Sequence, residues 1–168
     1  MLAHLPEVQR TGREETARKF LRARGVDEAE AIQLSAETLA VLDDPVFAAA
    51  FALPGRAEVA IVADLPELGD GARVHGRVDR LAVAGDDVLI VDFKTNRPPP
   101  AREEDVPRIY ATQMALYRAA AARIFPGKRI ACALVWTEGP ILMPLSEAFL
   151  EAETSRIHAR LDRDGYGS

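Results

Sequence analysis

The chain has little cysteine, few aromatic residues and no long apolar run. Its 168 residues include one cysteine, Cys132, which excludes an internal disulfide and any zinc or iron–sulfur site built from several cysteines. No apolar run reaches the roughly eighteen residues of a membrane span, and no basic flank precedes an apolar stretch at the N-terminus. The sequence therefore predicts a cytoplasmic protein with neither a membrane span nor a signal peptide.

The net charge and the absence of a phosphate-loop motif limit the functions that the chain can have. A net charge of −5 is unfavourable for a freestanding nucleic-acid binder, although metal ions held by carboxylates make such a surface less negative. No Walker-type phosphate loop occurs, which excludes an ATPase or helicase activity of the chain's own. With 48% hydrophobic and 28% charged residues, the chain is long enough to bury one sizeable core.

The order of the predicted elements gives the fold class. A helical lead-in over about residues 1–53 contains helices at 16–24 and from Asp27 to about 43, with a short piece at 46–53. A capping box at 11–14 and a stop at Gly25 bound the first helix. The core, about residues 56–161, has strands predicted at 57–63, 74–83, 88–93, 129–137 and 141–145, and helices at 105–125 and 146–161. This order predicts a single α/β domain with a mixed central sheet flanked by helices.

One lysine marks the candidate site. Of the 21 basic residues only three are lysines, and Lys94 stands two residues after Asp92 at the tip of an apolar strand. The D-x-K tripeptide alone is common in chains of this length. The neighbouring hairpin adds a second carboxylate: a two-residue loop at Gly85–Asp86 would place Asp79 opposite Asp92, with their Cβ atoms roughly 4.5–5.5 Å apart.

Two carboxylates facing each other destabilise a sheet unless something compensates their charge. A divalent cation does so, and Mg²⁺ prefers such oxygen ligands. A lysine beside the cation orients the attacking water and stabilises the charge that develops on the phosphate. Asp79, Asp92 and Lys94 therefore predict metal-assisted phosphodiester hydrolysis, with Mg²⁺ as the cation and Mn²⁺ as a possible substitute.

The helix predicted at 105–125 adds a further constraint. Tyr110, Gln113, Tyr117, Ala120 and Ile124 recur on one face at spacings of three and four, so Gln113 lies in an otherwise apolar stripe. A buried amide needs hydrogen-bond partners. Gln113 is therefore predicted to reach either the carboxylate–lysine site or a DNA phosphate.

Three motifs together resemble the successive signatures of the PD-(D/E)xK nuclease superfamily, in its RecB-like branch. They are G-x-x-D, D-x-K and Q-x-x-x-Y, carried by Gly76 and Asp79, Asp92 and Lys94, and Gln113 and Tyr117. Within that branch, the chain most resembles the C-terminal nuclease domain of the AddA subunit of bacterial helicase–nucleases, which process double-strand breaks for recombinational repair. The resemblance implies a restriction-endonuclease-like core and a Mg²⁺-dependent exonuclease acting on DNA. It also implies two partners, the helicase portion of the same parent chain and an AddB-like subunit.

The resemblance implies a role for each motif residue. Asp79 and Asp92 would be metal ligands, with the backbone carbonyl of Phe93 completing the protein's share of the coordination shell. Lys94 would be the catalytic lysine. The pair Gln113 and Tyr117 would support the site and its DNA.

Glutamate and histidine positions agree less fully with the family. Glu58, on the preceding strand, resembles a glutamate that the branch often places there, and a solvated strand glutamate fits the sequence equally well.

The family's histidine ligand follows a glycine near the start of the opening helix, but His4 has no such glycine and matches a later, non-catalytic position. The resemblance therefore predicts a fragment of a larger chain, with weak or no activity in isolation. His75 is predicted at a strand end and His158 on a solvated helix face.

Two other functions remain open from the sequence. One is a resolvase- or restriction-like endonuclease built on the same core. The other is a non-catalytic DNA-binding or docking module that keeps only the fold. The intact set of Asp79, Asp92 and Lys94 favours a nuclease over the docking module.

Overall fold

The N-terminal helices pack on each other and form their own apolar cluster. The computed structural model describes residues 5–43, 55–96, 98–136 and 141–163. Helix α1 (Arg13–Arg22) packs against α2 (Glu28–Asp43) through a cluster that includes Leu5, Ala17 and Leu42. The predicted piece at 46–53 and His4 lie outside the described residues.

Local hydrogen bonds at these helix ends test the capping predictions. Asp27 Oδ1 accepts the Glu30 backbone N–H at 3.0 Å, which confirms the predicted start of α2. The predicted capping box at 11–14 is wrong, because a 3₁₀ turn over Arg10–Gly12 precedes α1 and its N-cap, Gly12, makes no side-chain cap. The stop at Gly25 is confirmed by its φ of 82°, although α1 itself ends three residues earlier.

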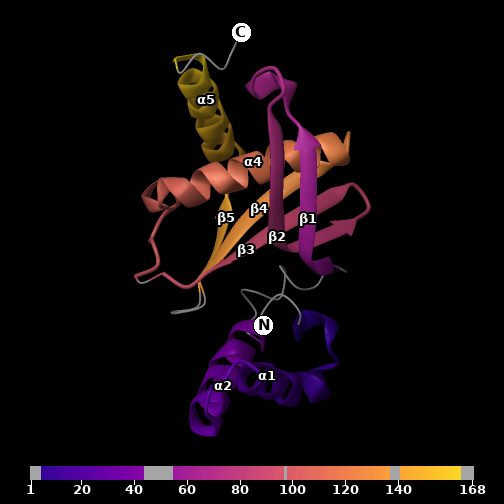
Figure 1. The fold of residues 1–168 in the computed structure, drawn as a ribbon, viewed down its shortest axis with the longest axis vertical. Helices are drawn as coiled ribbons and strands as arrows, with labels where there is room; N and C mark the ends of the chain where they lie inside the picture. Colours follow the sequence, from indigo (N-terminus) through magenta and orange to yellow (C-terminus); the bar gives the residue numbers. More distant parts are fainter. Residues whose placement is uncertain (1–4, 44–54, 97, 137–140, 164–168) are drawn as a thin grey trace.

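In the described part of the chain, five strands form one mixed sheet in the order β1-β2-β3-β4-β5 (Figure 1). The strands are β1 (Gly55–Asp64), β2 (Arg73–Ala84), β3 (Asp87–Lys94), β4 (Arg129–Trp136) and β5 (Ile141–Leu145). Among the pairings of these described strands, that of β3 with β4 is parallel and the other three are antiparallel. The chain crosses between these two strands through α4 (Arg108–Ile124), and α5 (Glu147–Arg163) closes the described part. The predicted α/β class with a mixed sheet flanked by helices is confirmed.

Helix α4 lies across one face of the sheet and supplies much of the core (Figure 1). It begins after Pro107, three residues later than predicted, and buries a stripe that includes Met114, Tyr117 and Ala120. Ile124, which the sequence places on that stripe, is the last residue of α4 and is 43% exposed. Helix α5 extends to Arg163, two residues beyond its predicted end.

The β2–β3 hairpin has the predicted loop and register. Ala84 pairs with Asp87, and the ladder continues to Arg80 and Val91. Gly85, the first loop residue, has a φ of 54°, a conformation that glycine adopts without strain. The backbone pairing stops at Arg80, one residue before Asp79, so the two aspartates are not joined by backbone hydrogen bonds.

Side-chain alternation along β2 changes phase at this same point. Val74 and Val78 pack on the α4 side of the sheet, and so does Leu81, although regular alternation would turn Leu81 to the other side. On the neighbouring strand β1, Glu58 has a φ of 50°, and it is not paired with Asp79 although the residues on either side are paired across the two strands. The irregularity is a local bulge shared by both strands, and Asp79 lies in it.

The backbone strain at Glu58 is testable by comparing two substitutions. Left-handed backbone costs an L-residue about 1–2 kcal/mol, so Glu58→Gly should be more stable than Glu58→Ala by about 1 kcal/mol. At Ala60, on the same strand, alanine should be more stable than glycine, so Ala60→Gly should destabilise the protein by about 0.5–1 kcal/mol. Urea denaturation of the three variants measures both differences, and an alanine at position 58 as stable as glycine would contradict the strain.

Candidate active site

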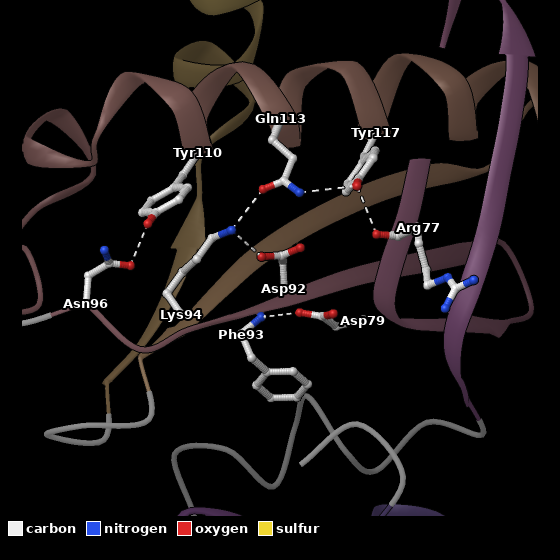
Figure 2. Close-up of polar contacts among 9 residues, drawn as sticks. All are labelled: Arg77, Asp79, Asp92, Phe93, Lys94, Asn96, Tyr110, Gln113 and Tyr117. Atoms are coloured by element: carbon white, nitrogen blue, oxygen red, sulfur yellow. Dashed lines mark hydrogen bonds and ion pairs between the residues drawn. The ribbon is translucent and has the colours of Figure 1, made fainter. Parts of the chain in front are cut away.

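The candidate site is centred on the Lys94 ammonium, at the end of β3 beneath α4 (Figure 2). Its Nζ lies 2.5 Å from Asp92 Oδ2 and donates to Gln113 Oε1 at 2.8 Å. The ring of Tyr110 lies 4.0 Å from the same nitrogen, measured to its centroid. The Lys94 and Asp92 side chains are only 10% and 5% exposed, so this is a buried ion pair with additional polar and aromatic contacts.

Asp79 joins the site through the backbone of β3 rather than through the strand ladder. Its Oδ2 accepts the Phe93 N–H at 2.8 Å. This bond fixes the carboxylate beside Asp92 at the place where β2 stops pairing with β3 (Figure 2). The structure thus brings the two predicted carboxylates together, but the contact depends on a side chain that replaces a backbone pair.

Burial and neighbouring charge act on Asp92 in opposite directions. Desolvation raises the pKa of the Asp92 carboxyl above its ordinary value, the Lys94 ammonium lowers it, and the negative charge of Asp79 raises it further. Since the net effect is upward, the ionised carboxylate is destabilised when only protein groups surround it. A cation bound between the two aspartates would relieve this cost.

The donor set fits a hard divalent cation. Each aspartate uses Oδ2 in the contacts above, which leaves Oδ1 of Asp79 and of Asp92 as ligand atoms. Phe93 follows Asp92 in the chain, and its backbone N–H binds Asp79, so its main chain lies at the site. Its ring packs on the opposite side of the sheet against Val91 and Val135. Among the described residues, no group of three or more His, Cys, Asp or Glu side chains could hold a metal ion. The cation would therefore rest on the two carboxylates and the Phe93 backbone carbonyl, with water completing its shell.

Gln113 and Tyr117 form a directional chain of hydrogen bonds that starts at the lysine. An ammonium only donates, so the amide oxygen of Gln113 faces Lys94 and the amide nitrogen faces Tyr117, whose hydroxyl oxygen lies 3.2 Å away. The Tyr117 hydroxyl then donates to the Arg77 backbone carbonyl at 2.8 Å. The chain links β3, α4 and β2, which fits a positioning role for both helix residues.

Gly76 gives Tyr117 its space. A Cβ atom at Gly76 would lie 2.6 Å from Tyr117 Cε1 and 2.9 Å from its hydroxyl oxygen, far inside normal contact. The first residue of the G-x-x-D motif is therefore required by packing. It leaves room for the ring whose hydroxyl holds the strand that carries Asp79.

The structure also places the other residues singled out in the sequence. Glu58 is 51% exposed and approaches Arg77 at 3.5 Å. His75 is exposed and lies near the start of β2, in agreement with its predicted position at a strand end. His158 is half-buried on α5 rather than solvated.

Sequence reasoning missed the contact between Tyr110 and the lysine. The sequence places Tyr110 on the helix stripe without assigning it a function, and it assigns no role to Asn96. In the structure the Tyr110 hydroxyl donates to Asn96 Oδ1 at 2.5 Å, which holds the ring against the ammonium. The spacing of Tyr110 three residues before Gln113 was the available signal, because residues three apart share a helix face.

The described site defines a class of protein. Paired carboxylates and a buried lysine lie together on a mixed sheet crossed by a helix, which agrees with the motif order of a nuclease family. The sequence profile of the PD-(D/E)XK nuclease superfamily matches residues 3–162, nearly the whole chain. The chain belongs to the PD-(D/E)XK nuclease superfamily, whose members are phosphodiester hydrolases that generally use divalent metal ions.

Solved structures support the fold. A protein from Eubacterium rectale, named as a candidate exonuclease, superposes with a TM-score of 0.59 at 14% identity. The match covers 97% of this chain and 66% of that one, so the present chain spans about two thirds of the relative's length. A second structure, SSO0001, is 19% identical, with coverage of 93% and 71%, but its TM-score of 0.34 carries no argument. The comparison with curated proteins gave no match. Among the described residues, no helix has the length and apolar character needed to span a membrane.

A substitution at Gly76 tests the packing argument. Gly76→Ala should destabilise the protein by about 1–3 kcal/mol, because the new methyl group overlaps a buried ring. Tyr117→Leu removes the overlapping atoms, so Gly76→Ala should cost much less in that background. Tyr117→Phe keeps the ring and should give little relief. Thermal unfolding of the single and double variants measures this coupling, and equal costs in all backgrounds would contradict it.

The contribution of the Tyr110 ring is testable separately from that of its hydroxyl. Tyr110→Phe keeps the aromatic face and should retain phosphodiesterase activity within a few-fold. Tyr110→Leu removes a cation–π contact worth about 0.5–2 kcal/mol, so kcat should fall about 3- to 30-fold with little change in KM. Equal activity of the two variants in a steady-state assay would show that the ring does not position the lysine.

Proposed function

We propose that this chain is a Mg²⁺-dependent deoxyribonuclease domain that hydrolyses phosphodiester bonds in DNA. The observation that carries the proposal is the Lys94 ammonium, buried beside Asp92 and Gln113 and next to a second carboxylate, Asp79. Oxygen-only donors favour Mg²⁺, with Mn²⁺ as a replacement.

The residues divide the chemistry among them. Asp79, Asp92 and the Phe93 carbonyl would hold the cation, which when bound lowers the pKa of a coordinated water and polarises the phosphate. Lys94 donates hydrogen bonds to the phosphate oxygens as negative charge develops on them. Gln113 and Tyr117 keep the ammonium in place through the hydrogen bonds described above. Hydrolysis then adds water across the phosphorus–oxygen bond of the scissile phosphodiester.

The biological setting is also part of the proposal. The resemblance to the AddA nuclease domain supports an exonuclease that processes double-strand breaks during recombinational repair in the cytoplasm. It would act on strands unwound by the helicase portion of the same parent chain, together with an AddB-like subunit. The name of the Eubacterium rectale relative, a candidate exonuclease, agrees with this choice. Residues 1–168 would form one nuclease domain, with Glu58 as a supporting residue at its edge.

An assay on linear and circular single-stranded DNA tests the proposal. Mg²⁺ or Mn²⁺ should support degradation of the linear strand, and an end-dependent enzyme should spare the circle. Lys94→Ala should lower the rate about 10²- to 10³-fold through the loss of transition-state stabilisation. Lys19→Ala removes an exposed lysine on α1 and is the matched control, expected to be as active as the unaltered chain.

Three results would contradict parts of this proposal. Cleavage of the circle would indicate an endonuclease related to resolvases or restriction enzymes. DNA binding without cleavage under any divalent metal, by this chain and by its proposed parent chain, would indicate a docking module. Activity that survives Lys94→Ala would remove the lysine from the mechanism.

A further inference from the structure

Helix α5 buries a carboxylate against α4, outside the candidate site. Glu153 is 3% exposed and is, with Leu150, one of the two residues that α5 buries in the described part of the chain. Its Oε1 accepts a hydrogen bond from Thr112 Oγ1 at 2.7 Å, and its Oε2 pairs with Arg156 on the same helix. Both carboxylate oxygens thus have a partner, and one of these partners belongs to α4.

A buried carboxylate is an expensive way to join two helices. A charge withdrawn from water destabilises the fold unless it is paired and hydrogen-bonded. Apolar side chains of similar volume usually make such a contact at least as stable. Glu153 therefore contributes direction to the contact between α4 and α5 more than it contributes stability.

The apolar face of α4 specifies the rotation of this helix only weakly. Its buried residues are Met114, Tyr117 and four alanines, at positions 111, 115, 120 and 121. An alanine methyl group presents almost the same surface after a small rotation of the helix, whereas larger interlocking side chains do not. Hydrogen bonds depend on direction, so polar contacts are suited to fix this rotation.

The residue that binds Glu153 is next to the residue that binds the catalytic lysine. Thr112 donates to α5, and Gln113, one residue later and about 100° further around α4, accepts from the Lys94 ammonium. Atoms at the surface of a helix lie roughly 5–6 Å from its axis, so a rotation of about 10° moves them by about 1 Å. A rotation that breaks the contact with Glu153 would therefore displace the Gln113 amide from the ammonium.

Helix α5 also holds the segment that leads into α4. Glu103, in a 3₁₀ turn at Glu103–Asp105, accepts the Ser146 backbone N–H at 2.7 Å and the Ser146 hydroxyl at 2.6 Å. Ser146 is the residue directly before α5. The chain between Lys94 and Gln113 is thus fastened to α5 at two places, one at the start of α5 and one in its middle.

We propose that Glu153 is a positioning residue of the nuclease site. Through Thr112 it fixes the rotation of α4, and so it holds the Gln113 amide against the Lys94 ammonium. The proposal rests on the nuclease function proposed above and adds a residue that acts through a helix rather than on the substrate.

The side-chain amide signals of the chain in metal-free buffer test this positioning directly. The sequence has three glutamines and one asparagine, so a ¹⁵N–¹H spectrum contains few such signals, and that of Gln113 is assigned from its loss in Gln113→Leu. Thr112→Val keeps the shape of the side chain and removes the hydroxyl. In this variant the Gln113 signal should shift, and its protons should exchange with water several-fold faster. Thr112→Ser restores the hydroxyl and should restore the unaltered signal.

A matched control and a double variant separate positioning from a loss of stability. Thr154→Val removes a hydroxyl that binds the Leu150 carbonyl at 2.9 Å within α5, and it should leave the Gln113 signal unchanged. Thr112→Val/Glu153→Leu removes the buried charge together with its partner, so it should be at least as stable as Thr112→Val. Its Gln113 protons should still exchange as fast as those of Thr112→Val. An unaltered Gln113 signal in this double variant would overturn the proposal, because apolar packing would then suffice to position α4.

Steady-state hydrolysis of bis(p-nitrophenyl) phosphate with Mg²⁺ or Mn²⁺ relates the position of Gln113 to the reaction. Misplacement of a positioned group by about 1 Å costs up to about 10²-fold in rate, so kcat of Thr112→Val should fall about 3- to 30-fold with little change in KM. Thr112→Ser should recover most of the loss. An unchanged Gln113 signal in Thr112→Val, or a displaced signal with an unaltered kcat, would overturn the proposal.

The two measurements distinguish a failure of this inference from a failure of the proposed function. Intact hydrolysis with an unchanged Gln113 signal in Thr112→Val would refute the role of Glu153 and leave the nuclease standing. No hydrolysis of this ester or of DNA, by this chain and by its proposed parent chain, would refute the nuclease. The amide spectra need neither metal nor activity, so they would still decide whether Glu153 positions α4.

Discussion

The rest of the site depends on the burial of the Lys94 ammonium. A cation withdrawn from water is stable only when partners replace its hydration, and here they come from two elements: Asp92 on β3, and Gln113 with the Tyr110 ring on α4. With 3.6 residues per turn, a shift of α4 by one residue would rotate the amide about 100° away. The lysine therefore fixes the register of the helix over the sheet. Through the hydroxyl of Tyr117, the helix in turn holds β2.

The bulge shared by β1 and β2 reconciles two requirements of the sheet. Pairing with β3 requires Leu81 on the α4 side, whereas pairing with β1 puts Val78 on that same side. A regular strand cannot satisfy both, because residues three apart point to opposite faces. The structure accepts a broken pair and a left-handed Glu58, and Asp79 is left with no strand partner. Its carboxylate is then able to take the Phe93 N–H and lie beside Asp92. Local strain of this kind is typical of functional sites.

The parts predictable from sequence were those governed by short-range rules. The two-residue loop at Gly85–Asp86 determined the hairpin register, and strand alternation placed Lys94 with Asp92. The phase change at Asp79 was not predictable, since it arises from competition between two neighbouring strands. The capping box at 11–14 failed because a 3₁₀ turn brought Gly12, not Thr11, to the helix start. The contact of Tyr110 with the ammonium required knowledge of how α4 lies across the sheet. Side-chain spacing predicts a shared face but not the residue opposite.

Charge distribution, rather than net charge, decides how an acidic chain could hold a polyanion. Two of the acidic groups, Asp79 and Asp92, lie where a bound cation would cancel their charge, so the site is repulsive to DNA only without metal. Most exposed arginines around the sheet are neutralised by carboxylates and add little attraction at physiological salt. Under the proposed function, attraction at the site then depends on the cation that Asp79 and Asp92 would hold. Binding of DNA should then depend on the divalent cation as hydrolysis does, because without it the two carboxylates repel the phosphate backbone.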